Sequence, residues 1–212
     1  MKVLITAGPT HEPIDPVRFI GNRSSGKMGY SIARAFLEQG HEVVLVSGPV
    51  TLELSHEKLT LIKVESAEEM YNEVMQHLDY NIAVMSAAVA DFTPIDVANE
   101  KIKKQAGQNE MTIKLKKTKD ILASLGLVKK ENQFLVGFAL ETHNEEENAL
   151  GKLELKKADL IVLNSMNDKG AGFGHDTNKT TLFYKNGQKK EMPLMQKGEL
   201  GEALAKKILS LI

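Results

Sequence analysis

Three stretches near the start of the chain decide the fold: KVLIT at residues 2–6, GKMGYSIARAFLEQ at residues 26–39 and EVVLV at residues 42–46. The first and third are short apolar runs of the kind that form buried strands. In the second, apolar residues recur at helical spacing, and Gly40 is a typical residue just after a helix end. A strand, a helix and a second strand in this order predict a right-handed βαβ unit.

The same alternation continues to the C-terminus. Further strands are predicted at 59–64, 81–85, 134–138 and 160–163, and further helices at 67–77, 120–127, 145–157 and 199–211. An exposed strand is predicted at 111–115, and Asn186-Gly187 predicts a hairpin between 180–184 and 189–192. We therefore expect the α/β class: a Rossmann-like parallel sheet with helices on both faces, plus a C-terminal β-hairpin.

Composition limits the possible functions. With 212 residues, the chain is expected to form a single domain over 1–212. The formal net charge is -1, so we expect neither nucleic acid nor a membrane surface as a partner. The absence of cysteine excludes disulfides, thiolate nucleophiles and enzyme-bound thioesters. No stretch has the form of a signal peptide or the length of a membrane span, so a cytoplasmic enzyme or binding protein is expected.

Ligands of such sheets bind outside the carboxyl ends of the strands. Three long connections, 7–24, 86–104 and 164–178, are expected at that edge. Within and just after the first of them, residues 21–28 have the spacing of a phosphate-binding P-loop, but Met28 replaces the Ser or Thr that would hold magnesium. The motif also begins about fifteen residues after its strand, whereas a P-loop follows directly, so a true P-loop is disfavoured.

A weaker anion site remains possible there, because Ser24, Ser25 and Gly26 would present backbone N–H groups at a helix N-terminus. The alternative is that Ser24 or Ser25 only caps the helix. Asn22 also has two interpretations: a turn residue beside Gly21, or a carboxamide that donates to a developing oxyanion. The residues alone favour the turn.

Two lysine groups and one carboxylate are further candidates. Asp91 follows a buried strand and could take a magnesium ion or a ribose hydroxyl, and the lysine run at 101–104 comes shortly after it. Lys152 and Lys156 share one helix face by their spacing. The alternatives are a solvated charge run and cations favoured by the helix dipole. The histidines show no metal-ligand spacing, and no G-x-G-x-x-G follows the first strand.

These motifs together closely resemble phosphopantothenoylcysteine synthetase, in its stand-alone bacterial form. The resemblance covers essentially the whole chain. It rests on ITAGPT at 5–10, EPIDPVRFI at 12–20, NRSSGKMG at 22–29, SAAVAD at 86–91, KIKK at 101–104 and GFALET at 137–142. In many bacteria such a domain is the C-terminal half of a protein whose other half is a flavin-dependent decarboxylase. The motifs here start at residue 3, so no flavin is expected.

The resemblance implies a two-step ligation. The carboxylate of 4′-phosphopantothenate attacks the α-phosphate of CTP, assisted by Mg²⁺, and L-cysteine then displaces CMP from the acyl-cytidylate. It further implies a homodimer with the site near the interface; the hairpin around Asn186-Gly187 is a candidate dimer element. The alternatives are an NAD(P)-dependent oxidoreductase and a non-catalytic nucleotide-sensing module on a similar fold.

The same resemblance implies roles for individual residues. Catalytic roles fall on Asn22, which handles the acyl intermediate, and on Lys101, which faces the triphosphate. Substrate phosphate or acyl contacts fall on Asn22, Ser24, Ser25 and Gly26. The nucleotide site comprises Met85, Ser86, Ala87, Asp91, Lys101, Lys119, Asp120, Ile121, Leu122, Phe138, Lys152 and Lys156. Leu140 departs from the family pattern, in which a small residue follows Ala139, and this affects local packing only.

Overall fold

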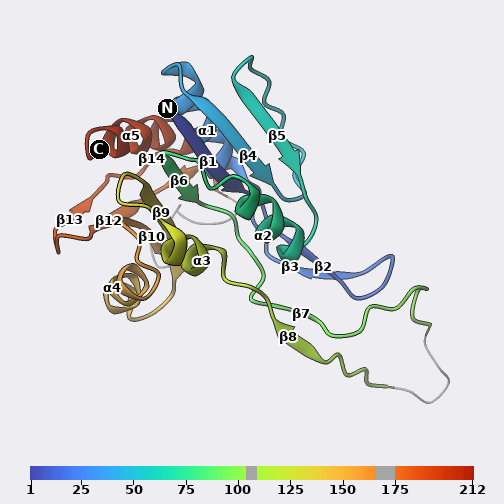
Figure 1. Cartoon of the computed structure of the whole chain (residues 1–212). Helices are drawn as coiled ribbons and strands as arrows, with labels where there is room; N and C mark the ends of the chain where they lie inside the picture. The colour runs from blue at the N-terminus through green and yellow to red at the C-terminus, as the bar shows by residue number, and fades with distance from the viewer. Residues whose placement is uncertain (104–108, 166–174) are drawn as a thin grey trace.

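The computed structural model describes residues 1–103, 109–165 and 175–212. An eight-stranded sheet forms the centre, with strand order β13-β12-β10-β9-β6-β1-β4-β5 (Figure 1). Six neighbouring strands are parallel: β10 (Leu160–Ser165), β9 (Phe134–Glu141), β6 (Ile82–Met85), β1 (Lys2–Ala7), β4 (Glu42–Ser47) and β5 (Leu59–Lys63). In chain order these six follow the Rossmann arrangement 3-2-1-4-5-6, so the topological switch point lies between β1 and β6. The predicted fold class is confirmed.

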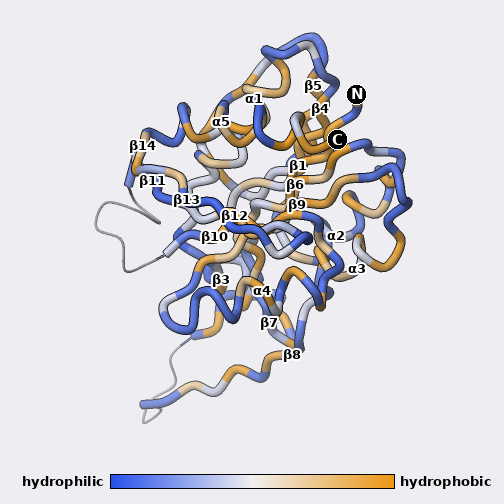
Figure 2. The backbone as a smooth tube through the Cα atoms, turned by 90° about the vertical axis from the view of Figure 1, so that its left-hand side faces the viewer, coloured by the Kyte–Doolittle hydropathy of each residue, from blue (hydrophilic) through white to orange (hydrophobic). Residues whose placement is uncertain are grey.

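Helices cover both faces of this sheet, so the sheet separates two hydrophobic cores, one on each face. On one face lie α1 (Lys27–Glu38) and α5 (Lys197–Leu209), and their apolar residues pack with Val3, Ile5 and Val84. The other face is covered by α2 (Ala67–Gln76), α3 (Ile121–Val128) and α4 (Glu145–Leu155). Hydrophobic colour runs along parts of the central strands in Figure 2, and β4, β6 and β9 are mostly buried, which explains why their positions were evident from sequence.

The C-terminal hairpin is also confirmed. The antiparallel strands β12 (Thr180–Tyr184) and β13 (Lys189–Glu191) extend the sheet beyond β10. Gly187 has a φ of 82°, a conformation that favours glycine, and this explains the Asn-Gly signal. A short pair, β11 (Thr177–Asn178) and β14 (Met195–Gln196), leads into α5, which begins two residues before the predicted start at residue 199.

Two predictions about the irregular segments were wrong. The loop at 7–24 contains an antiparallel hairpin of β2 (His11–Pro13) and β3 (Phe19–Gly21). The exposed strand expected at 111–115 is instead β8 (Leu115–Lys117), paired with β7 (Phe92–Pro94), for which no strand was predicted within the connection 86–104. Both pairs consist of three-residue strands with little burial, so their sequences carry almost no periodic signal.

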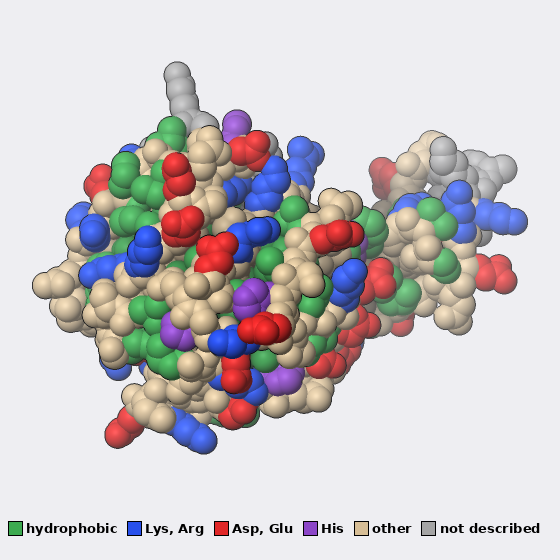
Figure 3. Space-filling view, turned by 90° about the horizontal axis from the view of Figure 1, so that it is seen from above, with side chains coloured by type: hydrophobic (Ala, Val, Ile, Leu, Met, Phe, Trp, Pro, Cys, Tyr) green, Lys and Arg blue, Asp and Glu red, His purple; other side chains and the backbone are tan. Residues whose placement is uncertain are grey.

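The segment from β7 to β8 projects from the body of the protein, and we call its described residues, 92–103 and 109–117, the arm (Figures 1 and 3). The buried carboxylate of Asp15, in the turn of the β2–β3 hairpin, attaches this arm to the body. It accepts hydrogen bonds from the N–H of Ile102 at 3.1 Å and from the guanidinium of Arg18, and Arg18 in turn donates to the Ile102 carbonyl at 3.1 Å.

Candidate active site

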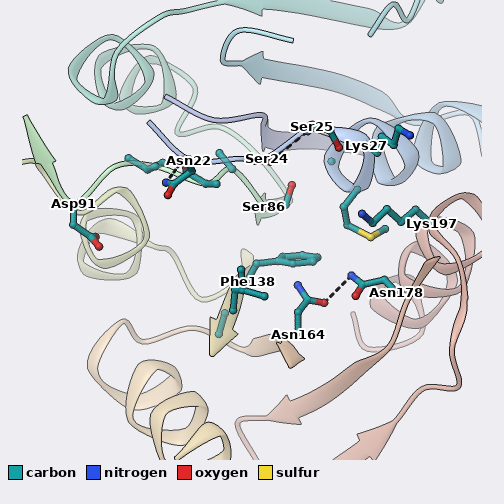
Figure 4. Close-up of a pocket in the computed structure, with 18 of the residues that line it drawn as sticks. Asn22, Ser24, Ser25, Lys27, Ser86, Asp91, Phe138, Asn164, Asn178 and Lys197 are labelled. Atoms are coloured by element: carbon teal, nitrogen blue, oxygen red, sulfur yellow. Dashed lines mark hydrogen bonds between the residues drawn. The ribbon is translucent and has the colours of Figure 1, made fainter. Parts of the chain in front are cut away.

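A cavity of about 320 Å³ lies at the carboxyl ends of the central strands, beside the switch point between β1 and β6 (Figure 4). Its walls come from the segment that leads into α1 and its first turn, from the connection after β6, from the C-terminal parts of β9 and β10, from α4, and from the β11–α5 region. Of the residues predicted to bind substrate or nucleotide, this cavity brings together Asn22, Ser24, Ser25, Gly26, Ser86, Ala87, Asp91, Phe138 and Lys152.

Backbone hydrogen bonds join the connections that follow β1 and β6. The N–H of Ala88 donates to the Gly8 carbonyl at 2.8 Å, and the N–H of Thr10 donates back to the Ala88 carbonyl at 3.3 Å. Side chains extend this pairing, because Ser86 Oγ donates to the Thr6 carbonyl at 2.6 Å. The two connections therefore form one rigid wall, whose small residues let a ligand approach the backbone closely.

Asn22 lies on this wall. Its side-chain Nδ2 donates to the Ala88 carbonyl at 2.9 Å, so the residue links the segment after β3 to the segment after β6. The side chain is otherwise exposed to the cavity. One N–H of the side-chain amide is used in the hydrogen bond to Ala88. A side-chain amide carries a second N–H, which can donate to a bound ligand.

The N-terminus of α1 is not capped by a serine side chain, as the alternative interpretation of Ser24 and Ser25 had it. Gly26, with a φ of 76°, is the N-cap and makes no side-chain cap hydrogen bond, so neither Ser24 nor Ser25 caps the helix. Ser24 Oγ instead accepts from the N–H of Gly26 at 3.3 Å. The first intrahelical bond runs from Tyr30 to Gly26, so the N–H groups of residues 27–29 precede it and face the end of the helix that attracts anions.

A second cavity, of about 660 Å³, adjoins the first. Ala87, Val89, Asp91, Phe138 and Lys152 line both, and therefore form their common wall. All other predicted nucleotide residues except Lys101 and Lys156 line the second cavity. These are Met85, Lys119, Asp120, Ile121 and Leu122. Apart from Lys101 and Lys156, the predicted substrate and nucleotide residues thus line two adjoining spaces.

The helix lysines have separate contacts. Lys152 Nζ donates to the Phe138 carbonyl at 3.1 Å, which places the amine on the common wall. Lys156 lines neither cavity and forms an ion pair with Asp120 at 2.7 Å. Burial is the largest single influence on the pKa of Asp120 and raises it, but the hydrogen bonds from Lys156 and the N–H of Ala123, with the charges of Lys156 and Lys152, together outweigh burial, so this pKa lies below its ordinary value. Lys156 thereby fixes the carboxylate that caps α3 through the N–H of Ala123.

Lys101 is not brought to the cavities. Lys101 is exposed on the arm and lines neither cavity, and the same holds for its neighbour Lys103. Lys104 lies outside the described residues. The connection 164–178, predicted at the ligand edge, is likewise described only at its ends. These ends supply Asn164 and Asn178, whose side chains hydrogen bond to each other at 2.8 Å in the cavity wall.

Sequence reasoning missed Asn164, Asn178 and Lys197 as lining residues. Each lies where a strand or helix terminus meets the cavity, a placement that depends on tertiary packing. Among the described residues, no group of three His, Cys, Asp or Glu side chains could hold a metal ion. Within the same residues, no helix combines the length and apolar character needed to cross a membrane.

Comparison with known proteins places the chain in a family. The sequence model of the DNA/pantothenate metabolism flavoprotein C-terminal domain matches residues 1–212. The coenzyme A biosynthesis bifunctional protein CoaBC of Bacillus subtilis (strain 168) is 49% identical over 210 residues, covering 99% of this chain and 51% of that protein. A cysteine/cysteine sulfinic acid decarboxylase from an unknown prokaryotic organism is 50% identical over 212 residues, covering 100% of this chain and 58% of that protein. The chain thus spans about half the length of these curated relatives.

Solved structures agree with this placement. The crystal structure of the C-terminal domain of CoaBC has a TM-score of 0.82 at 41% identity, covering 99% of this chain and 94% of that one. A DNA/pantothenate metabolism flavoprotein from Streptococcus pneumoniae has a TM-score of 0.85 at 26% identity, covering 100% of both chains. The match of fold, of motifs and of the family model over the full length shows that this chain belongs to the DNA/pantothenate metabolism flavoprotein C-terminal domain family.

Proposed function

We propose that this chain joins the carboxyl group of 4′-phosphopantothenate to the amine of L-cysteine, with CTP as the activating nucleotide. The observation that carries the proposal is the common wall between the two cavities, because a ligase of this kind must bring a carboxylate against the α-phosphate of a nucleotide. The relatives named as coenzyme A biosynthesis proteins support the same pathway. A relative of similar identity is named as a decarboxylase and is covered to 58%, but the solved C-terminal domain of CoaBC is matched over 94% of its own length, which favours the coenzyme A assignment.

In the proposed reaction, a carboxylate oxygen bonds to the α-phosphorus of CTP and the bond to pyrophosphate breaks. The cysteine amine then attacks the acyl carbon, loses a proton and releases CMP. Lys152 lies on the common wall and would stabilise negative charge that develops between the two ligands. Asn22 would hold the acyl group through its amide, and the N–H groups at the start of α1 would hold phosphoryl oxygens.

Magnesium is expected to accompany the triphosphate. Mg²⁺ is commonly held by one or two carboxylates together with substrate phosphates, so a site with few protein ligands fits it. Asp91 lines both cavities and is the carboxylate that fits this role, since Asp120 is engaged with Lys156. The ion would neutralise charge on the phosphates, while Asp91 would orient it toward the common wall.

We also infer a homodimer that forms through the arm and the β2–β3 hairpin. These two segments expose eight large apolar side chains: Val17, Phe19, Phe92, Ile95, Val97, Ile102, Met111 and Leu115. A surface of this kind marks a protein–protein contact. The C-terminal hairpin, the other candidate, ends in a strand of exposed charged residues, so the arm is favoured. Since Lys101 lies on the arm and outside the cavities of its own chain, we propose that it serves the partner's cavity in such a dimer.

The proposal includes three further expectations: residues 1–212 act as one domain, the domain works without flavin, and the protein is cytoplasmic. An assay of pyrophosphate release with each substrate omitted in turn tests the function. Release that requires phosphopantothenate supports a ligase, NAD(P) binding without release supports an oxidoreductase, and CTP binding without turnover supports a sensing module. Comparing kcat/KM for CTP and ATP tests the nucleotide; equal values would defeat the CTP assignment alone.

A further inference from the structure

The side chains of Asn164 and Asn178 form a hydrogen-bonded pair in the wall of the first cavity. Asn164 lies near the end of β10, and Asn178, in β11, is 3% exposed. The Nδ2 of Asn178 donates to the Oδ1 of Asn164 at 2.8 Å, drawn as a dashed line in Figure 4. Neither the motifs of the sequence nor the proposed reaction steps give this pair a role.

The backbone fixes the orientation of both side-chain amides. The N–H of Lys179 donates to the Oδ1 of Asn178 at 3.1 Å, so the NH₂ group of Asn178 is the part that faces Asn164. An amide NH₂ group donates and does not accept, so Asn164 must turn its oxygen toward Asn178. The NH₂ group of Asn164 is thereby directed away from Asn178, and Figure 4 shows its nitrogen on the side of Phe138.

The NH₂ group of Asn164 has no protein acceptor among the described residues, and it lies on the side of the cavity. The neighbouring side chains that β9 contributes to the cavity are apolar: Phe138, Ala139 and Leu140. A few polar groups in an otherwise apolar wall fix the orientation of a bound molecule. A purely structural link between β10 and β11 would need only the oxygen of Asn164, so it leaves the other half of this amide unexplained.

We propose that Asn178 is a positioning residue: it holds Asn164 so that the NH₂ group of Asn164 donates to an oxygen of the bound ligand. The inference deepens the proposed function and rests on it. Two ligands of that reaction offer such oxygens, in the phosphate, hydroxyl and amide groups of phosphopantothenate and in the phosphate and ribose groups of CTP. The shared chemistry is a hydrogen-bond acceptor, and the test separates the two sources.

Asn178→Asp should reverse the orientation of Asn164. A carboxylate only accepts, so it still receives the N–H of Lys179, and Asn164 must now turn its NH₂ group toward residue 178. The oxygen of Asn164 then faces the cavity and repels the acceptor of the ligand. We expect the affinity for either phosphopantothenate or CTP, measured by calorimetry, to fall about tenfold or more, because an acceptor has replaced a donor. The ligand that responds is the one that Asn164 contacts.

A double variant separates this effect from a direct effect of the new charge. Asn164→Leu keeps the approximate size of the side chain but has no amide to turn, and it should itself weaken binding of the same ligand about tenfold. Adding Asn178→Asp to Asn164→Leu should then change that affinity by less than about twofold, because Asn178 acts through Asn164. Asn186→Asp, in the exposed turn between β12 and β13, adds the same charge outside the cavity and should change neither affinity.

A loss of about tenfold from Asn178→Asp that persists in the Asn164→Leu background would overturn the inference. Either single variant binding both ligands within about twofold of the wild-type affinity would also overturn it, as would a wild-type protein that binds neither ligand. If Asn164→Leu does not fold, Asn164→Ala takes its place in the same comparison. Binding needs no turnover, so a protein that shows this coupling but releases no pyrophosphate would reject the proposed function and keep the positioning role.

Discussion

The side-chain amide of Asn22 donates to the backbone carbonyl of Ala88 at 2.9 Å, and so joins the approach to α1 with the connection after β6. Ala88 is itself paired with Gly8 and Thr10, so Asn22 is fixed relative to the end of β1. The residue that the resemblance assigns to the acyl intermediate is thus held on the wall beside the switch point. Its position suits both an orienting role and direct contact with the acyl group.

Asn22→Asp should spare activation and block amide formation. The carboxylate would lie against the Ala88 carbonyl and beside an acyl oxygen that develops negative charge, and it repels both. We expect the second step to slow by about a hundredfold or more, so that the acyl-nucleotide accumulates. Rapid-quench separation of pyrophosphate release from amide formation measures this. Equal losses in both steps, shared by Asn22→Ala, would assign the residue to binding or folding instead.

Lys101→Gln should reduce activation by about a hundredfold, because one charge-assisted phosphate contact is lost. The arm places Lys101 outside the cavities of its own chain, so the dimer proposal makes a sharper prediction. Mixing inactive Lys101→Gln with inactive Asn22→Asp should restore about a quarter of wild-type activity, since each mixed dimer contains one intact site. Failure of the mixture to regain activity, with dimers still present by light scattering, would argue that Lys101 serves its own chain.

Gly29→Ala should destabilise the protein and distort the cavity. An added Cβ at Gly29 would lie 2.5 Å from the Cβ of Ala7 and 2.7 Å from Ser86 Oγ, so α1 must move away from the strand ends. We expect a loss of about 1–3 kcal/mol in the free energy of unfolding. Gly151→Ala is the matched control, because nothing lies within 4 Å of its added Cβ in α4. That change should stabilise by about 0.5–1 kcal/mol, and denaturant unfolding of both variants checks the contrast.

Acid should weaken the attachment of the arm. The Arg18 guanidinium, together with N–H donors from residues 17, 18 and 102, holds the pKa of the Asp15 carboxyl well below its usual range. Because the pKa is lower in the folded state, the stability it contributes is complete above the unfolded pKa of about 3.9 and declines as pH falls below it. Asp15→Asn should therefore lower Tm at neutral pH, by an amount that narrows in acid. A difference in Tm that does not vary with pH would contradict this assignment.

The sequence sufficed for the parts of the protein in which burial produces a pattern. The runs at 2–6 and 42–46 are apolar because both faces of the sheet are covered, and the helix starting near Gly26 shows a clear apolar stripe. The β7–β8 pair lacked such a pattern, because its short strands are largely exposed and pair only with each other. Sequence reasoning therefore predicted the sheet but not the arm.

The candidate site shows the same division. Lys152 and Lys156 were predicted together by their spacing, yet only Lys152 reaches the common wall, because Lys156 is held by Asp120. Lys197 lines the cavity because α5 packs against α1, which brings this lysine close to Lys27, a residue that lies 170 positions earlier in the chain. No local pattern encodes a contact of that kind, so only the packed structure reveals it.

The proposed attack of the carboxylate on CTP is tested most directly by following the oxygen atoms of that carboxylate. Phosphopantothenate labelled with ¹⁸O in its carboxyl group is incubated with CTP and cysteine, and the products are analysed by mass spectrometry. Attack of the carboxylate on the α-phosphorus transfers one labelled oxygen to CMP, so we expect singly labelled CMP and unlabelled pyrophosphate. Unlabelled CMP, or label in pyrophosphate or inorganic phosphate, would contradict it.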